Sequence, residues 1–286
     1  MLQFISGFAK AMFLFLIASG LSLIWGVSKV LNLTHGSLYM LGAYLVFSLL
    51  HRLPLNPGYF LIAIVAASIL VALIGGVIEM VLLRRLYRAE EFYIILMTIA
   101  LIFIIDDVVR WIWGPYFLSV AKPTFLAGSW SIWGHSFPTY YIPILTAGPM
   151  IAIGLWFLVY RTRWGLLVRA AAMDREMLEA LGVDVPRVCT LTFMLGCGLA
   201  GMSGALAAAV VTLEPAMDAT VIIEAIAVVV IGGLGSLPGT LVAALLVGIL
   251  ESFAILIFPS ISLVLVFAIM TLIIIIHPAG LLGIPE

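Results

Sequence analysis

A short polar segment, Asn-Leu-Thr-His-Gly-Ser, separates two apolar runs near the N-terminus. Its hydrogen-bonding side chains are Asn32, Thr34, His35 and Ser37. Thr34 or Ser37 could cap a helix that begins near Gly36. If this break lies at membrane depth, its backbone must line protein or water, and the N-terminus of the helix would attract a carboxylate. The alternative is a turn whose polar groups merely satisfy one another, a role that suits His35.

A second break, Gly-Gly-Leu-Gly-Ser-Leu-Pro-Gly at 232–239, interrupts an apolar run that is too long for one membrane crossing. Its Gly-Ser-Leu triplet repeats residues 36–38, which is a weak sign of an internal repeat. Broken segments in corresponding halves point to a solute path, whereas close packing of helices through small residues is the alternative. The small residues at 196–205 indicate such a packing face. The candidate path residues are Asn32, Thr34, His35, Gly36, Ser37, Gly232, Gly233, Gly235 and Ser236.

Few ionisable residues fall within the apolar runs: Glu79, Asp106, Asp107, Arg110, Glu224 and Glu251. Each would be costly if it faced lipid. Asp106 and Asp107 precede Arg110 by four and three residues, so one or both can pair with it on a helix face. Glu79 lies a little over one turn before Arg84, near the end of its run. No continuous acidic or histidine path connects these groups, so the sequence gives proton-coupled transport little support.

The most soluble-like part of the chain is the polar stretch at 161–187. From Ala170 to Leu181, good helix formers place charged residues between apolar ones, and Gly182 follows as a C-cap. This pattern predicts a short amphipathic helix outside the membrane. A connecting helix that lies on the membrane surface would show the same pattern.

Groups that would carry catalysis are missing from the sequence. None of the three lysines, at positions 10, 29 and 122, belongs to a Gly-x-x-x-x-Gly-Lys-Ser/Thr phosphate-binding loop. No His and Cys cluster has zinc spacing, and no Ser and His pair forms a recognisable nucleophile motif. Cys189 and Cys197 would lie roughly 12 Å apart along one helix, which is beyond disulfide reach. We therefore expect no enzyme, no cofactor and no metal site, and any ATP hydrolysis must come from a separate subunit.

The elements that position these residues follow from the composition, which is 65% hydrophobic and 9% charged over 286 residues. Such a chain cannot be soluble alone, and its formal net charge of -1 offers no basic surface for nucleic acid. Most apolar runs can cross a bilayer core of roughly 30 Å as helices. They lie at about 5–27, 36–52, 58–83, 92–113, 139–160, 188–212, 222–258 and 261–276. We expect an all-α polytopic membrane protein of about eight transmembrane helices with broken or re-entrant segments, in a single domain over 1–286.

Arginine placement predicts the orientation in the bilayer. Eight of the thirteen Lys and Arg residues fall in two loops, at 84–88 and 161–187, which the positive-inside rule assigns to the cytoplasm. Two full spans separate these loops, as this assignment requires. The stretch at about 114–138 carries one basic residue, Lys122, among Phe and Trp residues, and suits an external loop. The sides of the two termini stay open, because the short and broken runs need not cross fully.

Three segments resemble one family, in the same order and at similar spacing, and the ending His-Pro-Ala-Gly-Leu-Leu-Gly also fits it. The segments are Asn-Leu-Thr-His-Gly-Ser-Leu-Tyr-Met-Leu-Gly-Ala-Tyr at 32–44, Asp-Arg-Glu-Met-Leu-Glu-Ala-Leu-Gly-Val-Asp-Val-Pro-Arg-Val at 174–188 and Val-Val-Val-Ile-Gly-Gly-Leu-Gly-Ser-Leu-Pro-Gly-Thr at 228–240. The chain resembles the high-affinity branched-chain amino acid ABC transporter permeases over nearly its whole length. It departs from that pattern at His277, where arginine is expected, and at Glu224, where lysine or a neutral residue is frequent.

The resemblance implies an ABC importer permease fold in the cell inner membrane. It implies three kinds of partner: a second homologous permease subunit, two cytoplasmic ABC ATPase subunits and an external solute-binding protein. The stretch at about 161–187 then becomes the coupling loop, whose short helix docks into an ATPase. The coupling residues are Met173, Asp174, Arg175, Glu176, Met177, Glu179, Ala180, Leu181 and Gly182.

The resemblance further implies ATP-driven alternating access for branched-chain or other hydrophobic amino acids. Two other functions stay open. The same machinery could import urea or short-chain amides, because the resemblance is less specific about the solute. A stand-alone ion-coupled secondary transporter would instead move its solute without any ATPase subunit.

Overall fold

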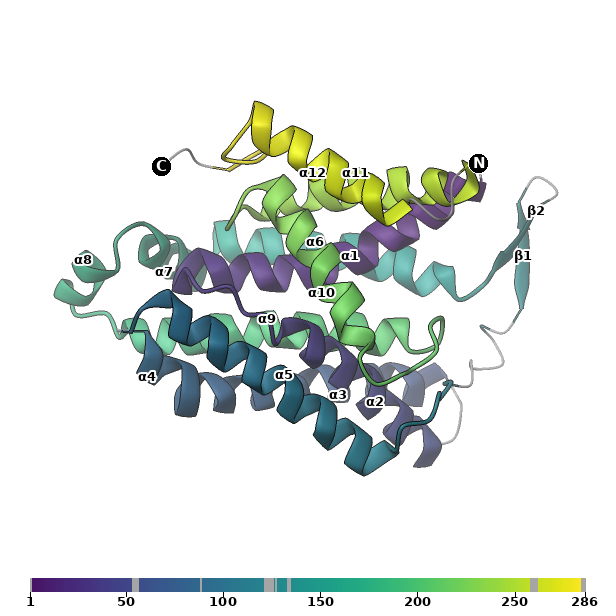
Figure 1. The fold of residues 1–286 in the computed structure, drawn as a ribbon, viewed down its shortest axis with the longest axis horizontal. Coiled ribbons are helices and arrows are strands. Elements are labelled where there is room, and N and C mark those ends of the chain that lie inside the picture. Colours follow the sequence, from purple (N-terminus) through teal and green to yellow (C-terminus); the bar gives the residue numbers. More distant parts are fainter. Residues whose placement is uncertain are drawn as a thin grey trace.

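The computed structural model describes residues 2–52, 57–87, 89–120, 126, 128–132, 135–257 and 262–283. Within these ranges the main body is a bundle of nine apolar helices, most of which run along the long axis of the molecule, whereas α10 crosses them steeply (Figure 1). They are α1 (Leu2–Ser28), α2 (His35–Arg52), α3 (Pro57–Ile78), α5 (Glu91–Trp113), α6 (Tyr141–Arg161), α9 (Val185–Ala207), α10 (Met217–Gly232), α11 (Leu237–Ile257) and α12 (Ser262–Ile276). The predicted all-α polytopic class is confirmed.

Six of these segments are long and apolar enough to cross a membrane: α1, the segment Pro57–Leu86 that begins with α3, α5, α6, α9 and α11. The other three are shorter, with 18 residues in α2, 16 in α10 and 15 in α12. The long apolar run at 222–258 is divided as predicted, since α10 ends at Gly232 and α11 begins at Leu237. The eight predicted runs therefore correspond to nine helices in the described part of the chain.

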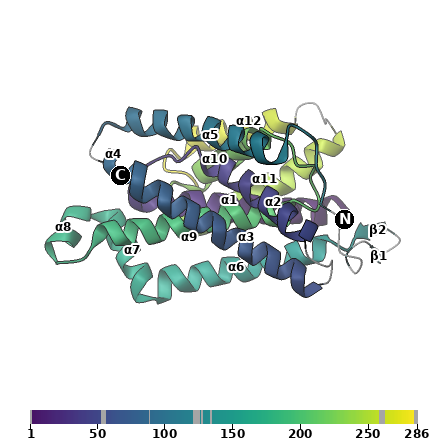
Figure 2. The ribbon, with the colours of Figure 1, turned by 90° about the horizontal axis from the view of Figure 1, so that it is seen from below.

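The two ends of the bundle differ (Figures 1 and 2). One end carries an antiparallel hairpin, β1 (Ser129–Ile132) paired with β2 (His135–Pro138), and the N-terminus lies beside it. We call this the hairpin end. At the opposite end, α7 (Arg163–Met173) and α8 (Arg175–Ala180) project beyond the bundle, and we call this the α8 end. Lys122 of the predicted external loop lies outside the described residues.

Helix α1 forms the centre of the bundle, and 78% of its apolar window is buried. Close approaches at small residues surround it with other helices. A Cβ at Gly20 would lie 2.5 Å from the Gly196 carbonyl oxygen of α9, and one at Gly248 of α11 would lie 2.6 Å from the Ala11 nitrogen. The small residues of α9 also face α3 and α2, which confirms the predicted packing face at 196–205.

Candidate functional site

Helix α2 begins inside the bundle rather than at one of its ends. The chain turns at Lys29, where φ is +54°, and returns to the level of Ile17, near the middle of α1. There His35 Nε2 donates to the Ile17 carbonyl oxygen at 3.0 Å, and the Thr34 hydroxyl donates to the Thr98 carbonyl oxygen at 2.9 Å. The first predicted break is therefore a helix start that is buried halfway along the central helix.

Polar groups at this break are buried, and not all of them are satisfied. Asn32 is 1% exposed, yet neither its amide nitrogen nor its amide oxygen has a hydrogen-bond partner among the described residues. The Nδ1 atom of His35 and the Oγ atom of Ser22 are likewise buried without a hydrogen-bond partner among the described residues. Buried polar groups of this kind normally bind water or another ligand, or carry out a function. The break thus differs from a turn whose polar groups satisfy one another.

The Ser37 hydroxyl does not serve as the helix cap that the sequence suggests, and joins two helices instead. It donates to Asp218 Oδ2 at 2.6 Å, and Asp218 is 3% exposed in the first turn of α10. Gly36 permits this approach, because a Cβ there would lie 2.7 Å from the Asp218 carbonyl oxygen. The Thr34 hydroxyl likewise has the distant partner described above. The beginnings of α2 and α10 therefore meet inside the bundle.

Asp218 was absent from the predicted set of intramembrane ionisable residues. The apolar run was expected to begin at residue 222, whereas α10 begins at Met217. A carboxylate in the first turn of a helix interacts favourably with the helix dipole. The position of Asp218 shortly before the apolar run could therefore have indicated that the helix begins earlier and includes this aspartate.

The glycine break between α10 and α11 lies elsewhere. Gly235 packs against Gly26, which lies close to the last turn of α1. A Cβ added at Gly26 would lie 3.6 Å from the Gly235 Cα. The C-terminal segment closes the break, since the Leu281 and Leu282 N–H groups donate to the carbonyl oxygens of Ile231 and Gly232 at 2.8 and 3.1 Å. This geometry agrees with the packing alternative for the glycines.

The two groups of candidate path residues are therefore not brought together. Those at 32–37 contact the beginning of α10, whereas Gly232, Gly233, Gly235 and Ser236 lie at or just beyond its end. The 16 residues of α10 separate the two groups by about 24 Å along the helix. Only the first group lies in the middle of the bundle.

Several charged residues in the helices form ion pairs. The Arg110 guanidinium lies 3.3 Å from Asp106 Oδ2, as predicted, and Arg84 Nε lies 3.7 Å from Glu79 Oε1. Lys10 of α1 forms ion pairs with Glu224 of α10 and Glu251 of α11. Both glutamates were predicted as intramembrane charges from the sequence, whereas Lys10, the cation that both contact, was not.

A polar network at the α8 end links three elements. Glu79 is fully buried in a π-helical turn, η1 (Glu79–Leu83), which continues through α4 (Arg84–Leu86). Its Oε2 accepts a hydrogen bond from Thr190 of α9 at 2.7 Å. The Arg175 guanidinium of α8 lies 5.6 Å from the centre of the Tyr87 ring. Burial and the nearby Glu79 carboxylate raise the pKa of Tyr87, so Arg175 stacks on a neutral phenol.

The predicted amphipathic helix at 170–181 is in fact two helices. Helix α7 ends at Met173, and Asp174 caps the next helix through its Oδ1, which accepts a hydrogen bond from the Met177 N–H at 2.8 Å. The prediction of one continuous helix was wrong because this aspartate favours the cap over a helix interior. The predicted C-cap is confirmed: Gly182 has φ of +82°, and its N–H donates to the Glu179 carbonyl oxygen at 3.0 Å.

Helix α8 is anchored on one side and exposed on the other. Leu178 is 6% exposed and belongs to a cluster that includes Val185 and Val188 of α9. In contrast, Met173 is 87% exposed, Leu181 73% and Met177 59%. Three large apolar side chains are thus exposed within nine residues at the tip of the molecule, and exposed apolar surface of this kind commonly marks a protein interface.

Comparison with known proteins identifies the family. The family model for the permease component of branched-chain amino acid transport systems matches residues 3–275. The chain belongs to this family. No solved structure shows a detectable match to the permease.

Three relatives are similar over most of their length. The LivH permease protein of the Escherichia coli K12 high-affinity branched-chain amino acid transport system is 28% identical over 285 residues, covering 95% of this chain and 91% of LivH. The corresponding BraD protein of Pseudomonas aeruginosa is also 28% identical, covering 99% of this chain and 96% of BraD. A probable LivH of Methanocaldococcus jannaschii is 28% identical over 247 residues, covering 84% and 76%.

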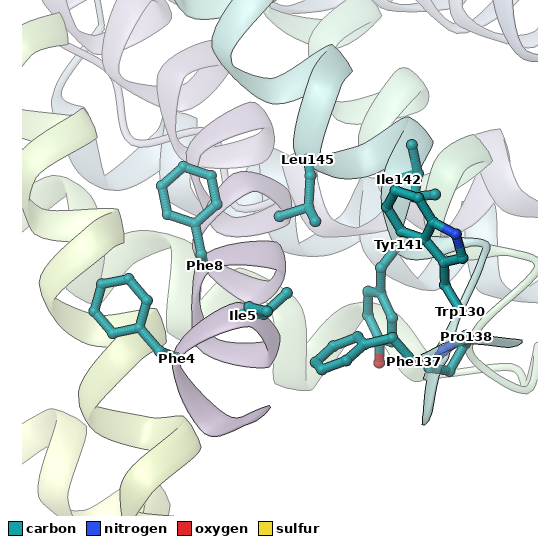
Figure 3. Close-up of a pocket in the computed structure, with 9 residues that line it drawn as sticks. All are labelled: Phe4, Ile5, Phe8, Trp130, Phe137, Pro138, Tyr141, Ile142 and Leu145. Carbon is teal, nitrogen blue, oxygen red and sulfur yellow. The ribbon is translucent and has the colours of Figure 1, made fainter. Parts of the chain in front are cut away.

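The permease has a cavity of about 370 Å³ at the hairpin end (Figure 3). Phe4, Ile5 and Phe8 of α1 line one side, and Trp130 and Phe137 of the hairpin line part of the other. Its remaining lining residues are Pro138, Tyr141, Ile142 and Leu145. None of these side chains is charged, so the cavity offers no ionic partner to a zwitterionic solute.

Substitution of Gly182 by alanine is expected to weaken the α8 turn of the permease without a steric clash. No atom lies within 4 Å of a Cβ at this position, but φ of +82° is unfavourable for alanine by about 1–2 kcal/mol. Gly182→Asn is the matched control, because asparagine tolerates this conformation. Hydrogen exchange of residues 175–183 should speed up in Gly182→Ala and change less in Gly182→Asn. Equal exchange in both variants would contradict the cap.

Proposed function

We propose that this permease is the membrane-spanning subunit of an ABC importer that moves branched-chain or other hydrophobic amino acids. The relatives LivH and BraD are named for branched-chain amino acid transport. The observation that carries the proposal is the exposure of Met173, Met177 and Leu181, which lie on and directly beside the capped helix α8. Such a rigid projection suits docking into a cleft on an ATPase.

The α8 end is proposed to face the cytoplasm of the cell whose inner membrane holds the permease. Both arginine-rich loops reach this end, and the positive-inside rule supports that side. The hairpin end, with the exposed Trp130, would then face outwards at the membrane interface. This orientation puts the N-terminus outside and the segment at 277–283 towards the inside.

The partners are proposed to be a second homologous permease, two cytoplasmic ABC ATPases and an external solute-binding protein. The chain contains no phosphate-binding loop, so ATP hydrolysis requires the ATPase subunits. The solute path would run between the two permeases, beside the buried break at Asn32 to Ser37. Unsatisfied polar groups at that break support contact with water or solute.

The proposed mechanism is alternating access driven by movement of α8. ATP binding would close the ATPase pair and displace α8, which is bound to α9 through Leu178 and stacked on Tyr87 through Arg175. The Glu79–Thr190 hydrogen bond would carry the displacement into the segment that begins with α3. Helix α9 in turn contacts α1 and α2, so a tilt of α9 would alter the buried break.

Uptake measurements in liposomes test this function. The importer with all its subunits is expected to accumulate labelled leucine when ATP is supplied, and the permease without its ATPases is expected to accumulate none. Uptake of urea or acetamide in place of leucine would overturn the proposed solute. Solute uptake by the permease without ATPases, driven by an ion gradient, would establish the secondary transporter instead.

A further inference from the structure

Three charged side chains from three helices meet inside the bundle. Lys10 Nζ on α1 lies 3.3 Å from Glu224 Oε1 on α10 and forms a shorter contact with Glu251 Oε1 on α11. Lys10 is the ninth residue of α1, which places it about 12 Å from the hairpin end of that helix. The trio therefore lies within the membrane-spanning part of the bundle, where uncompensated charge is costly.

The charges of the trio do not balance. One ammonium group faces two carboxylates, which leaves a formal charge of -1. In addition, Glu251 Oε2 is buried and receives no hydrogen bond from the described residues. A buried carboxylate oxygen without a donor is rarely left so in a folded protein. The trio therefore has carboxylate capacity that Lys10 alone does not satisfy.

The two carboxylates differ in access. The Glu251 side chain is 6% exposed and makes the closer contact with Lys10. The Glu224 side chain is 17% exposed and Lys10 is 31% exposed. A partly exposed ion pair at this depth cannot face lipid without a large cost, so it must face a water-filled path or a protein partner. Lys10 and Glu224 are thus the accessible members.

The trio is close to the place where α2 and α10 begin. Glu224 follows Asp218 by six residues on α10, a rise of about 9 Å. Asp218 is the residue that receives the hydrogen bond from Ser37. The accessible ion pair and the buried break therefore belong to one region of the bundle.

We propose that Lys10 and Glu224 bind the two charges of a zwitterionic amino acid, and that Glu251 holds Lys10 in place. The Glu224 carboxylate accepts hydrogen bonds from the solute ammonium group, and the Lys10 ammonium group donates to the solute carboxylate. Each charge then lies beside one of opposite sign. A neutral solute such as urea cannot form these two ionic contacts, so the site selects zwitterions.

This inference rests on the proposed function, and a matched pair of variants tests it. Glu224→Gln and Glu251→Gln each remove one carboxylate and change the formal charge of the trio from -1 to 0. Leucine uptake by the complete importer in liposomes is expected to fall about tenfold or more in Glu224→Gln, because a charge-assisted hydrogen bond to the solute is lost. It is expected to fall less in Glu251→Gln, whose carboxylate acts on the solute only by holding Lys10.

A purely structural trio predicts the opposite order. Glu251 is the more buried partner of Lys10, so its neutralisation would then do more damage than that of Glu224. Equal losses, or a larger loss in Glu251→Gln, would overturn the zwitterion site. Co-purification of the ATPases and basal ATP hydrolysis show that each variant still assembles.

A conservative pair covers the case in which the glutamine variants do not assemble. Glu224→Asp and Glu251→Asp keep all charges, but each withdraws a carboxylate by one methylene. The KM for leucine is expected to rise several-fold in Glu224→Asp and to rise less in Glu251→Asp, whose carboxylate acts on the solute only through Lys10, and a rise in Glu224→Asp that is no larger than that in Glu251→Asp would overturn the site. If the unaltered importer moves urea and no leucine, the proposed solute and the zwitterion site both fail. If the unaltered importer and the Glu224→Gln variant move leucine at equal rates, only the zwitterion site fails.

Discussion

The double substitution Glu179→Arg and Leu181→Arg is expected to abolish binding of the ATPase subunits to the permease. Leu181 is 73% exposed and Glu179 is half-exposed, so both positions lie on the proposed docking surface. An unpaired arginine buried in an apolar contact is strongly unfavourable, and loss of an interface anchor costs about 2–4 kcal/mol. Co-purification of the ATPases from detergent extracts measures the effect. ATP-dependent uptake should disappear with it.

The matched control places the same kind of charge at the opposite end of the molecule. Phe117 is 72% exposed beyond the end of α5, so Phe117→Arg alters an equally accessible apolar residue far from α8. This variant should retain the ATPases at the level of the unaltered permease. Retention of ATPases by the Glu179 and Leu181 variant, or their loss from the Phe117 variant, would contradict a docking role for α8.

Features of the permease that depend on local sequence could be predicted. The lengths of the hydrophobic runs predicted the positions of the helices, and the glycines at 232–239 predicted the break between α10 and α11. Gly182 was identified as a C-cap because the sequence pattern around it is local. The Asp106–Arg110 pair was predicted for the same reason, since a helix brings residues four apart onto neighbouring turns.

Features that depend on packing between distant segments could not be predicted. Ser37 and Asp218 are 181 residues apart in sequence, and Lys10 and Glu251 are 241 apart. Nothing in their local sequence indicates that these residues meet. The split at Asp174 was missed for another reason: aspartate is acceptable on an exposed helix, and only the bond to the Met177 N–H shows that it begins a new one. Both kinds of error affect the candidate path and the coupling helix more than the fold.

Substitution of Gly204 by leucine is expected to prevent recovery of folded permease. A Cβ at Gly204 of α9 would lie 1.9 Å from the Tyr39 carbonyl oxygen of α2. Because that oxygen belongs to a helix backbone, it cannot move aside as a flexible side chain would, and α2 and α9 must separate. Overpacking of this kind costs about 3 kcal/mol or more. The yield of monodisperse permease after extraction, and its thermal unfolding temperature, measure the loss.

Gly154→Leu separates this steric effect from other consequences of the exchange. Gly154 lies in α6, and no atom lies within 4 Å of a Cβ there. Both exchanges replace a helical glycine by leucine, which alone should stabilise a helix by roughly 0.5–1 kcal/mol, and both add the same apolar volume. Gly154→Leu is therefore expected to match or exceed the unaltered permease in yield. Equal losses at both positions would mean that glycine itself is needed, whereas a loss confined to Gly204 shows that backbone contact between α2 and α9 holds the buried helix start in place.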